Sequence, residues 1–119
     1  MSVELPLTKE RIDGLRCKLS AFVCKKAGLS LLSEPKFQAF EDGDMGGFFL
    51  LGIENDSAEK KIADCEYHDI DGGRVLLTLY SRDGRFLSSI EFWRLDFGRI
   101  LAFPEPEDLI HPAQYDTAQ

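Results

Sequence analysis

The segment Val75–Phe97, VLLTLYSRDGRFLSSIEFWRLDF, decides the fold and predicts a β-hairpin. Asp83-Gly84 lies between two runs of strand-forming residues, and Asp-Gly favours a tight hairpin turn because Gly adopts φ > 0 without steric cost. A two-residue turn would set Arg74 opposite Trp93, where its guanidinium could stack on the indole. A longer loop over residues 81–85 with a β-bulge is the alternative.

Side chains alternate between the two faces of a strand, so the hairpin has one apolar and one mixed face. The apolar face carries Val75, Leu77, Leu79, Phe86, Ile90 and Phe92. The mixed face carries Leu76, Thr78, Tyr80, Leu87, Ser89, Glu91 and Trp93. A slip by one residue would scramble both sets, so the pattern itself supports the pairing.

An amphipathic helix is predicted before the hairpin, over about residues 8–27. Thr8 is the expected N-cap, and Gly28 closes the helix as a C′ residue. Apolar residues recur at helical spacing along one stripe: Ile12, Leu15, Leu19, Phe22 and Val23.

Further strands are expected at 37–40, 48–53 and 60–69, separated by the turn-forming segments 41–47, 55–58 and 71–73. The apolar run 48–53 predicts a central strand with both faces covered. The predicted fold class is α+β, with the N-terminal helix packed on an antiparallel four- to five-stranded meander sheet. We expect a single domain over 1–119, with the sheet at about 37–97, a C-terminal segment at 98–113 and a frayed tail at 114–119.

The mixed face of the sheet leaves one question open. Residues 99–110 are apolar enough to cover it, with a short helical turn starting near Pro104–Pro106. If they do not cover it, the face is a large exposed apolar patch, and such patches mark interfaces.

Composition indicates a folded, cytoplasmic protein. The chain has 119 residues and 44% hydrophobic residues, enough for one real core. Its first residues lack the pattern of a secretory signal, and no apolar stretch approaches the ~20 residues of a membrane helix. The three cysteines Cys17, Cys24 and Cys65 are odd in number and sparse, which suits a reducing compartment.

The net charge of −7 is concentrated in the middle of the chain. Residues 41–71 hold ten Asp or Glu against two Lys or Arg, whereas residues 1–40 hold seven basic against four acidic residues. An acidic middle disfavours nucleic acid as a partner, because phosphates would be repelled. It is compatible with a basic protein partner, although acidic loops also serve solubility alone.

No metal or cofactor is expected. Asp42 and Asp44 suggest a calcium loop, but Gly46 and Ile53 occupy positions where an EF-hand needs oxygen ligands. The same loop lacks the Lys-Ser/Thr of a phosphate-binding loop. The two histidines, His68 and His111, are isolated from any metal-like cluster.

Several motifs, in their order and spacing, resemble an uncharacterised family of small bacterial α+β proteins, a domain of unknown function. The family's D-G-G-M-G-S loop is similar to Asp42-Gly43-Asp44-Met45-Gly46-Gly47, and its W-K-x-D-F strand end, followed by a proline, is similar to Trp93–Phe97 with Pro104. The other similar segments are Leu7-Thr8-x-x-Arg11, His68–Gly72 and Leu79–Phe86. The resemblance implies a fold and a bacterial source, and it supplies no mechanism.

The leading functional hypothesis is a non-enzymatic, acidic protein-binding module, similar in kind to immunity proteins that neutralise a basic toxin. Its candidate partner-binding residues are Asp42, Asp44, Tyr80, Trp93 and Arg94.

Two alternatives stay open. One is an enzyme or small-ligand protein with a site at the sheet edge, although no catalytic pair is recognisable among its candidates Asp42, Asp44, Cys65 and His68. The other is a structural homodimer whose sheet faces meet across Trp93 and Tyr80.

Overall fold

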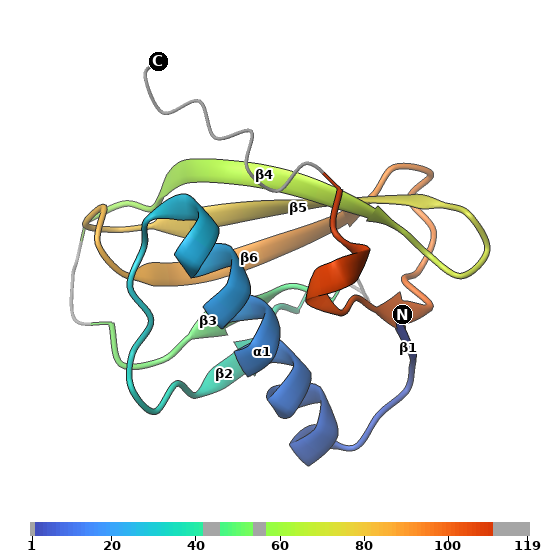
Figure 1. The fold of residues 1–119 in the computed structure, drawn as a ribbon, viewed down its shortest axis with the longest axis horizontal. Helices are drawn as coiled ribbons and strands as arrows, with labels where there is room; N and C mark the ends of the chain where they lie inside the picture. Colours follow the sequence, from blue (N-terminus) through green and yellow to red (C-terminus); the bar gives the residue numbers. More distant parts are fainter. Residues whose placement is uncertain (1, 42–45, 54–56, 111–119) are drawn as a thin grey trace.

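The computed structural model describes residues 2–41, 46–53 and 57–110, and it confirms the predicted α+β fold. One helix, α1 (Lys9–Ala27), packs on a five-stranded antiparallel sheet with strand order β2-β3-β6-β5-β4 (Figure 1). The strands are β2 (Phe37–Ala39), β3 (Phe48–Leu50), β4 (Lys60–His68), β5 (Arg74–Ser81) and β6 (Leu87–Arg94). A two-stranded sheet of β1 (Val3–Glu4) and β7 (Ala102–Phe103) lies beside it.

Helix α1 begins and ends where its capping residues predict. The Thr8 hydroxyl accepts the backbone N–H of Arg11, and Gly28 adopts a left-handed φ of 75°. Leu19 and Val23, from the predicted stripe, are fully buried against the sheet. The periodicity therefore identified the buried face of α1 correctly.

The β5–β6 hairpin forms with the longer, bulged loop and not with the two-residue turn. Leu79 pairs with Ile90 and Leu76 with Trp93. This pairing is shifted by two residues from the one that a two-residue turn would give. The Asp83 carboxylate holds the loop open by accepting the N–H groups of Arg85 (2.8 Å) and Phe86 (3.0 Å). Local side-chain hydrogen bonds of this kind compete with a tight turn.

A shift by two residues preserves the face of most side chains, so the predicted apolar face is nearly intact. The bulge between Tyr80 and Ser81 changes it only near the loop, where Leu87 enters the core and Phe86 is half-buried. The predicted stacking of Arg74 on Trp93 is wrong, because Arg74 binds the Glu66 carboxylate on the neighbouring strand instead (2.9 Å).

Strand β3 joins the sheet beside β6, so the expected hairpin between 48–53 and 60–69 does not form. Strands β4, β5 and β6 do follow one another as a meander. The apolar run 48–53 also has only one covered face. Phe48 and Leu50 are buried, whereas Phe49 is 37% exposed, because the described residues form no second layer on the other side of β3, where Phe40 contacts the Phe49 ring. A short apolar run in a sequence is compatible both with a strand covered on two faces and with a strand covered on one face.

The C-terminal segment packs on the same side of the sheet as α1. Ile100 and Phe103 belong to the core that α1 and the sheet share, and the predicted helical turn forms as η1 (Pro106–Asp108). Figure 1 shows α1 and η1 in front of the same face of the sheet. The predicted tail 114–119 and part of the predicted turn 55–58 lie outside the described residues.

Candidate functional site

No helix and no second sheet among the described residues packs on one face of the five-stranded sheet, although Thr78 and Ser89 within that face are buried. Because α1 and residues 100–103 both pack on the inner face, the other face carries the alternate residues of each strand. We call it the outer face, and it contains Phe49, Asp64, Glu66, Leu76, Thr78, Tyr80, Ser89, Glu91 and Trp93. Segment 99–110 therefore does not cover this face, which answers the question that the sequence left open.

Aromatic side chains stand at both ends of the outer face. Trp93 is 40% exposed, and its ring meets that of Phe97 in a T-shaped contact with 5.2 Å between centroids. Toward β2, Phe49 contacts Phe40 with 4.4 Å between centroids. Aromatic rings at such an exposed position are typical of protein-binding surfaces.

Phe97 combines exposure with an unfavourable backbone conformation. Its side chain is 72% exposed, and its φ is 64°, in the left-handed region that non-glycine residues rarely adopt. That conformation costs roughly 1–2 kcal/mol for an L-residue. Strained residues of this kind cluster at functional sites, where the strained geometry serves binding.

The cations on the outer face are already paired with carboxylates. Lys61 binds Asp64 (2.7 Å), and Arg74 binds Glu66 (2.9 Å). Glu91 accepts only a hydrogen bond from the Tyr80 hydroxyl (3.2 Å) among the contacts found on this face. The described strands of the outer face therefore carry one carboxylate more than they carry Lys or Arg.

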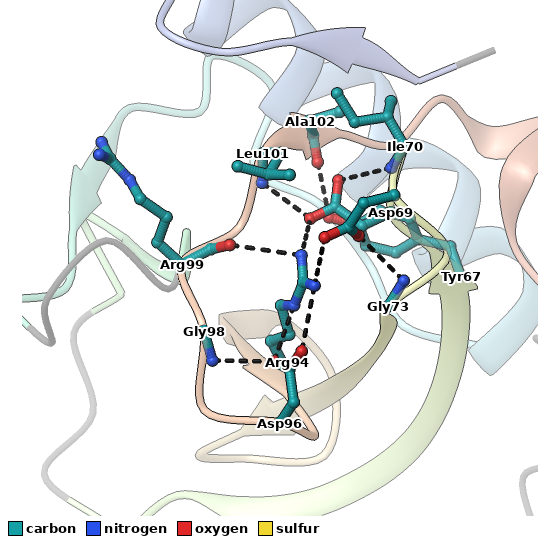
Figure 2. A network of polar contacts seen from close by, with 11 residues as sticks. Tyr67, Asp69, Ile70, Gly73, Arg94, Asp96, Gly98, Arg99, Leu101 and Ala102 are labelled. Atoms are coloured by element: carbon teal, nitrogen blue, oxygen red, sulfur yellow. Dashed lines mark hydrogen bonds and ion pairs between the residues drawn. The ribbon is translucent and has the colours of Figure 1, made fainter.

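A second polar cluster surrounds Arg94 at the end of β6, on the inner side of the sheet (Figure 2). Its guanidinium donates to Asp69 (2.8 Å), Asp71 (2.6 Å) and Asp96 (2.8 and 3.1 Å), and to the backbone oxygen of Arg99 (3.4 Å). These five hydrogen bonds use all five N–H groups of an arginine. A side chain at Gly73 would clash with this guanidinium, so the Asp-Gly-Gly turn leaves room for it.

The cluster shifts the titration of its members. Hydrogen bonds from Arg94 lower the pKa of Asp71 and that of Asp96 below the usual aspartate range. The same carboxylates, first Asp96 and then Asp71, raise the pKa of Arg94. All three groups therefore stay charged around neutral pH.

Asp69 extends the cluster to the C-terminal segment. Its side chain is fully buried, and it accepts the backbone N–H of Leu101 (2.8 Å) and of Ile70 (2.9 Å). Two residues earlier, on β4, the Tyr67 hydroxyl donates to the carbonyl of Ala102 (2.7 Å). The cluster thus holds residues 99–102 against the inner face and leaves the outer face free.

The structure separates the predicted partner-binding residues. Tyr80 and Trp93 lie on the outer face, whereas Arg94 points to the inner side and is 6% exposed. Asp42 and Asp44 lie outside the described residues. Phe97 was not among the predicted partner-binding residues. An aromatic residue directly before a glycine, just beyond the end of a strand, is a sequence signal for an exposed aromatic side chain in a turn.

Of the candidates for a catalytic site, Cys65 and His68 lie on opposite faces of the sheet, and Asp42 and Asp44 lie outside the described residues. Cys65 is buried on the inner face, and burial raises the pKa of its thiol to about 12. His68 lies three residues further along β4, on the outer face, and is exposed. Across the described ranges, no three His, Cys, Asp or Glu side chains are grouped closely enough to hold a metal ion, and no helix there is long and apolar enough to cross a membrane.

Fold and surface together define a small α+β domain with one open, aromatic sheet face. Residues 18–104 match the model of a family described as a domain of unknown function (DUF6984), and the chain belongs to that family. No curated protein and no solved structure matches the chain significantly.

Proposed function

We propose that this chain is a non-enzymatic protein-binding module whose outer face binds a basic protein. The observation that carries the proposal is Phe97, a 72% exposed aromatic residue held at φ 64° against Trp93. A large apolar side chain in a strained, exposed position contributes little to folding. Its contribution is therefore expected in a complex.

Charge indicates the chemistry of the partner. The chain carries −7, and the cations on the outer face are neutralised by Asp64 and Glu66. Asp96 directly precedes Phe97, and its side chain is 58% exposed although Arg94 binds it. Arginine and lysine side chains of a partner would stack on the two rings and meet the carboxylates of Asp96 and Glu91.

Arg94 supports this surface indirectly. Its backbone oxygen accepts the N–H of Phe97 (3.0 Å), and its side chain orients Asp96, which accepts the N–H of Gly98 (2.8 Å). It is thus a positioning residue for the turn that presents Phe97. Tyr80 would contribute at the other end of the face, and Asp42 and Asp44 would add negative charge.

The proposed setting is the bacterial cytoplasm. One partner with the required chemistry is a basic toxin, which this chain would neutralise as immunity proteins do. The three free thiols, Cys17, Cys24 and Cys65, support a reducing compartment.

A homodimer through the outer face is the second candidate, because exposed Trp93 and Phe49 would also suit a self-complementary contact. Each copy would bring the same excess of carboxylates to the interface, and like charges disfavour this pairing.

The proposal is tested by affinity capture from the host's lysate, comparing the wild-type chain with Phe97→Gly. Glycine adopts φ 64° without strain, so this variant is expected to fold at least as stably while it lacks the ring. Ile70→Ser is the matched control, since it removes another exposed apolar side chain (55%) that belongs to the turn between β4 and β5.

We expect wild type and Ile70→Ser to retain one stoichiometric basic protein that salt releases, and Phe97→Gly to lose it. Equal capture by Phe97→Gly would contradict the proposal. Self-association lost in Phe97→Gly, measured by light scattering, would support the homodimer instead.

A further inference from the structure

A cavity of about 470 Å³ lies between the loop before α1, α1 and the C-terminal segment, and its lining reaches Phe40 after β2. The loop before α1 forms one wall with Leu5 and Leu7, and α1 contributes Ile12 and Arg16. Ile100 and Leu101 of the C-terminal segment close another side. The volume is in the ordinary range for small-molecule sites, and most of the lining is apolar.

Arg16 is the polar group of this cavity. Its side chain is only 11% exposed, and its guanidinium carbon lies 5.5 Å from the centroid of the Phe48 ring. Nη1 donates to Asp13 (2.8 Å), but Nε is buried and has no hydrogen-bond partner. A buried N–H without an acceptor is rare and costs stability, so it indicates that an acceptor from outside the chain belongs there.

The neighbourhood of Arg16 is positive, unlike the chain as a whole. Asp13 is shared, because it also binds Lys9 (2.6 Å), so one carboxylate serves two cations. An anion would therefore be attracted to this cavity in a protein that carries −7 overall.

We propose that this cavity binds a small carboxylic acid with an apolar body, and that Arg16 holds its carboxylate. In a guanidinium, Nε–H and one N–H of Nη2 point the same way, and this edge matches the two oxygens of a carboxylate. The contact with Asp13 uses Nη1, so it does not engage that edge, and a small turn of the side chain toward the cavity would expose the buried Nε to the ligand. The apolar walls from Leu5, Ile12 and Ile100 would bury the rest of the ligand.

Octanoate is the test probe, and 1-octanol is its uncharged counterpart. Titration into the full ¹⁵N-labelled chain at pH 7 should shift the amide signals of residues such as Leu7, Ile12 and Leu101, with a Kd on the order of 1 mM or tighter. Arg16→Met keeps the length of the side chain and removes its donors. It is expected to weaken octanoate about tenfold or more and to leave octanol unchanged.

Arg11→Met is the matched control, because Arg11 is exposed on the same helix and should not affect either probe. Leu7→Trp, placed in the loop before α1, should narrow the cavity and weaken both probes, even if Arg16→Met fails to fold.

Three results would overturn the proposal: no octanoate binding at 10-fold above the expected Kd, shifts confined to the outer face, or full affinity in Arg16→Met. None of them bears on partner binding at Phe97, so this proposal and the proposed function can fail separately.

Discussion

Arg94 and Asp69 show how one buried ion pair organises the edge of this domain. Their side chains are 7% and 0% exposed, and Asp69 accepts two backbone N–H groups besides the guanidinium. Removing one member of a buried pair leaves the other charge uncompensated, which typically costs about 3–5 kcal/mol.

We therefore expect Asp69→Ala to lower the free energy of unfolding by about 3 kcal/mol or more, measured by urea denaturation. Asp71→Ala is the control, because it removes an acceptor of the same guanidinium whose side chain is 45% exposed. Equal losses in the two variants would show that burial of Asp69 does not matter.

The cluster also predicts a pH dependence. Arg94 lowers the pKa of Asp71 and of Asp96 in the folded state, so the unfolded chain takes up protons first as the pH falls. Their stabilisation is fully present above about pH 5 and is lost as the pH falls below about 4 through the folded pKa values.

Between pH 6 and pH 3, the stability of the wild type should fall more steeply than that of the double variant Asp71→Asn/Asp96→Asn. The measurement is urea unfolding across that range, and parallel curves would contradict the assigned hydrogen bonds.

At the scale of elements, the docking of the C-terminal segment decides which sheet face stays open. Tyr67 on β4 is buried, which raises the pKa of its hydroxyl, and this hydroxyl bonds the buried carbonyl of Ala102 on β7. Without the donor, that carbonyl would remain unpaired in the core.

Tyr67→Phe is therefore expected to lose about 1–2 kcal/mol of stability, measured by denaturant unfolding. Tyr80→Phe is its counterpart on the outer face, where the bond to Glu91 is half-exposed, and it should change stability by less than about 0.5 kcal/mol. A larger loss of stability in Tyr80→Phe than in Tyr67→Phe would mean that the C-terminal segment docks by its apolar contacts alone.

At the scale of the whole molecule, the two proposed surfaces are formed by different residues. Trp93 and Phe97 are on the outer face, and Arg16 lines the cavity beneath α1. Trp93 and Phe97 do not line the cavity, and sites without shared partners usually behave additively.

Phe97→Gly should thus bind octanoate with wild-type affinity, and Arg16→Met should retain the captured partner. A loss of octanoate binding in Phe97→Gly, measured by the same amide shifts, would show that the two faces are coupled.

Sequence patterns were sufficient for most features whose deciding contacts are local, and the loop of the β5–β6 hairpin is the exception. Thr8 and Gly28 set the ends of α1, its apolar spacing predicted the buried stripe, and the Asp83-Gly84 region predicted the central hairpin. Trp93 and Tyr80 were also assigned to the mixed face correctly, because alternation along a strand is a two-residue property.

Other features depend on residues far apart in the chain. The pairing of β3 with β6, the seating of residues 99–103 beside α1 and the meeting of Arg94 with Asp69 all join segments that no local pattern relates. The sequence by itself determined the helix with its ends, the strands of the central hairpin and the faces of most of their side chains, since these follow from backbone geometry over a few residues. Only the tertiary structure decided the strand order, the open face and the unpaired Nε of Arg16, because these depend on how the whole core packs.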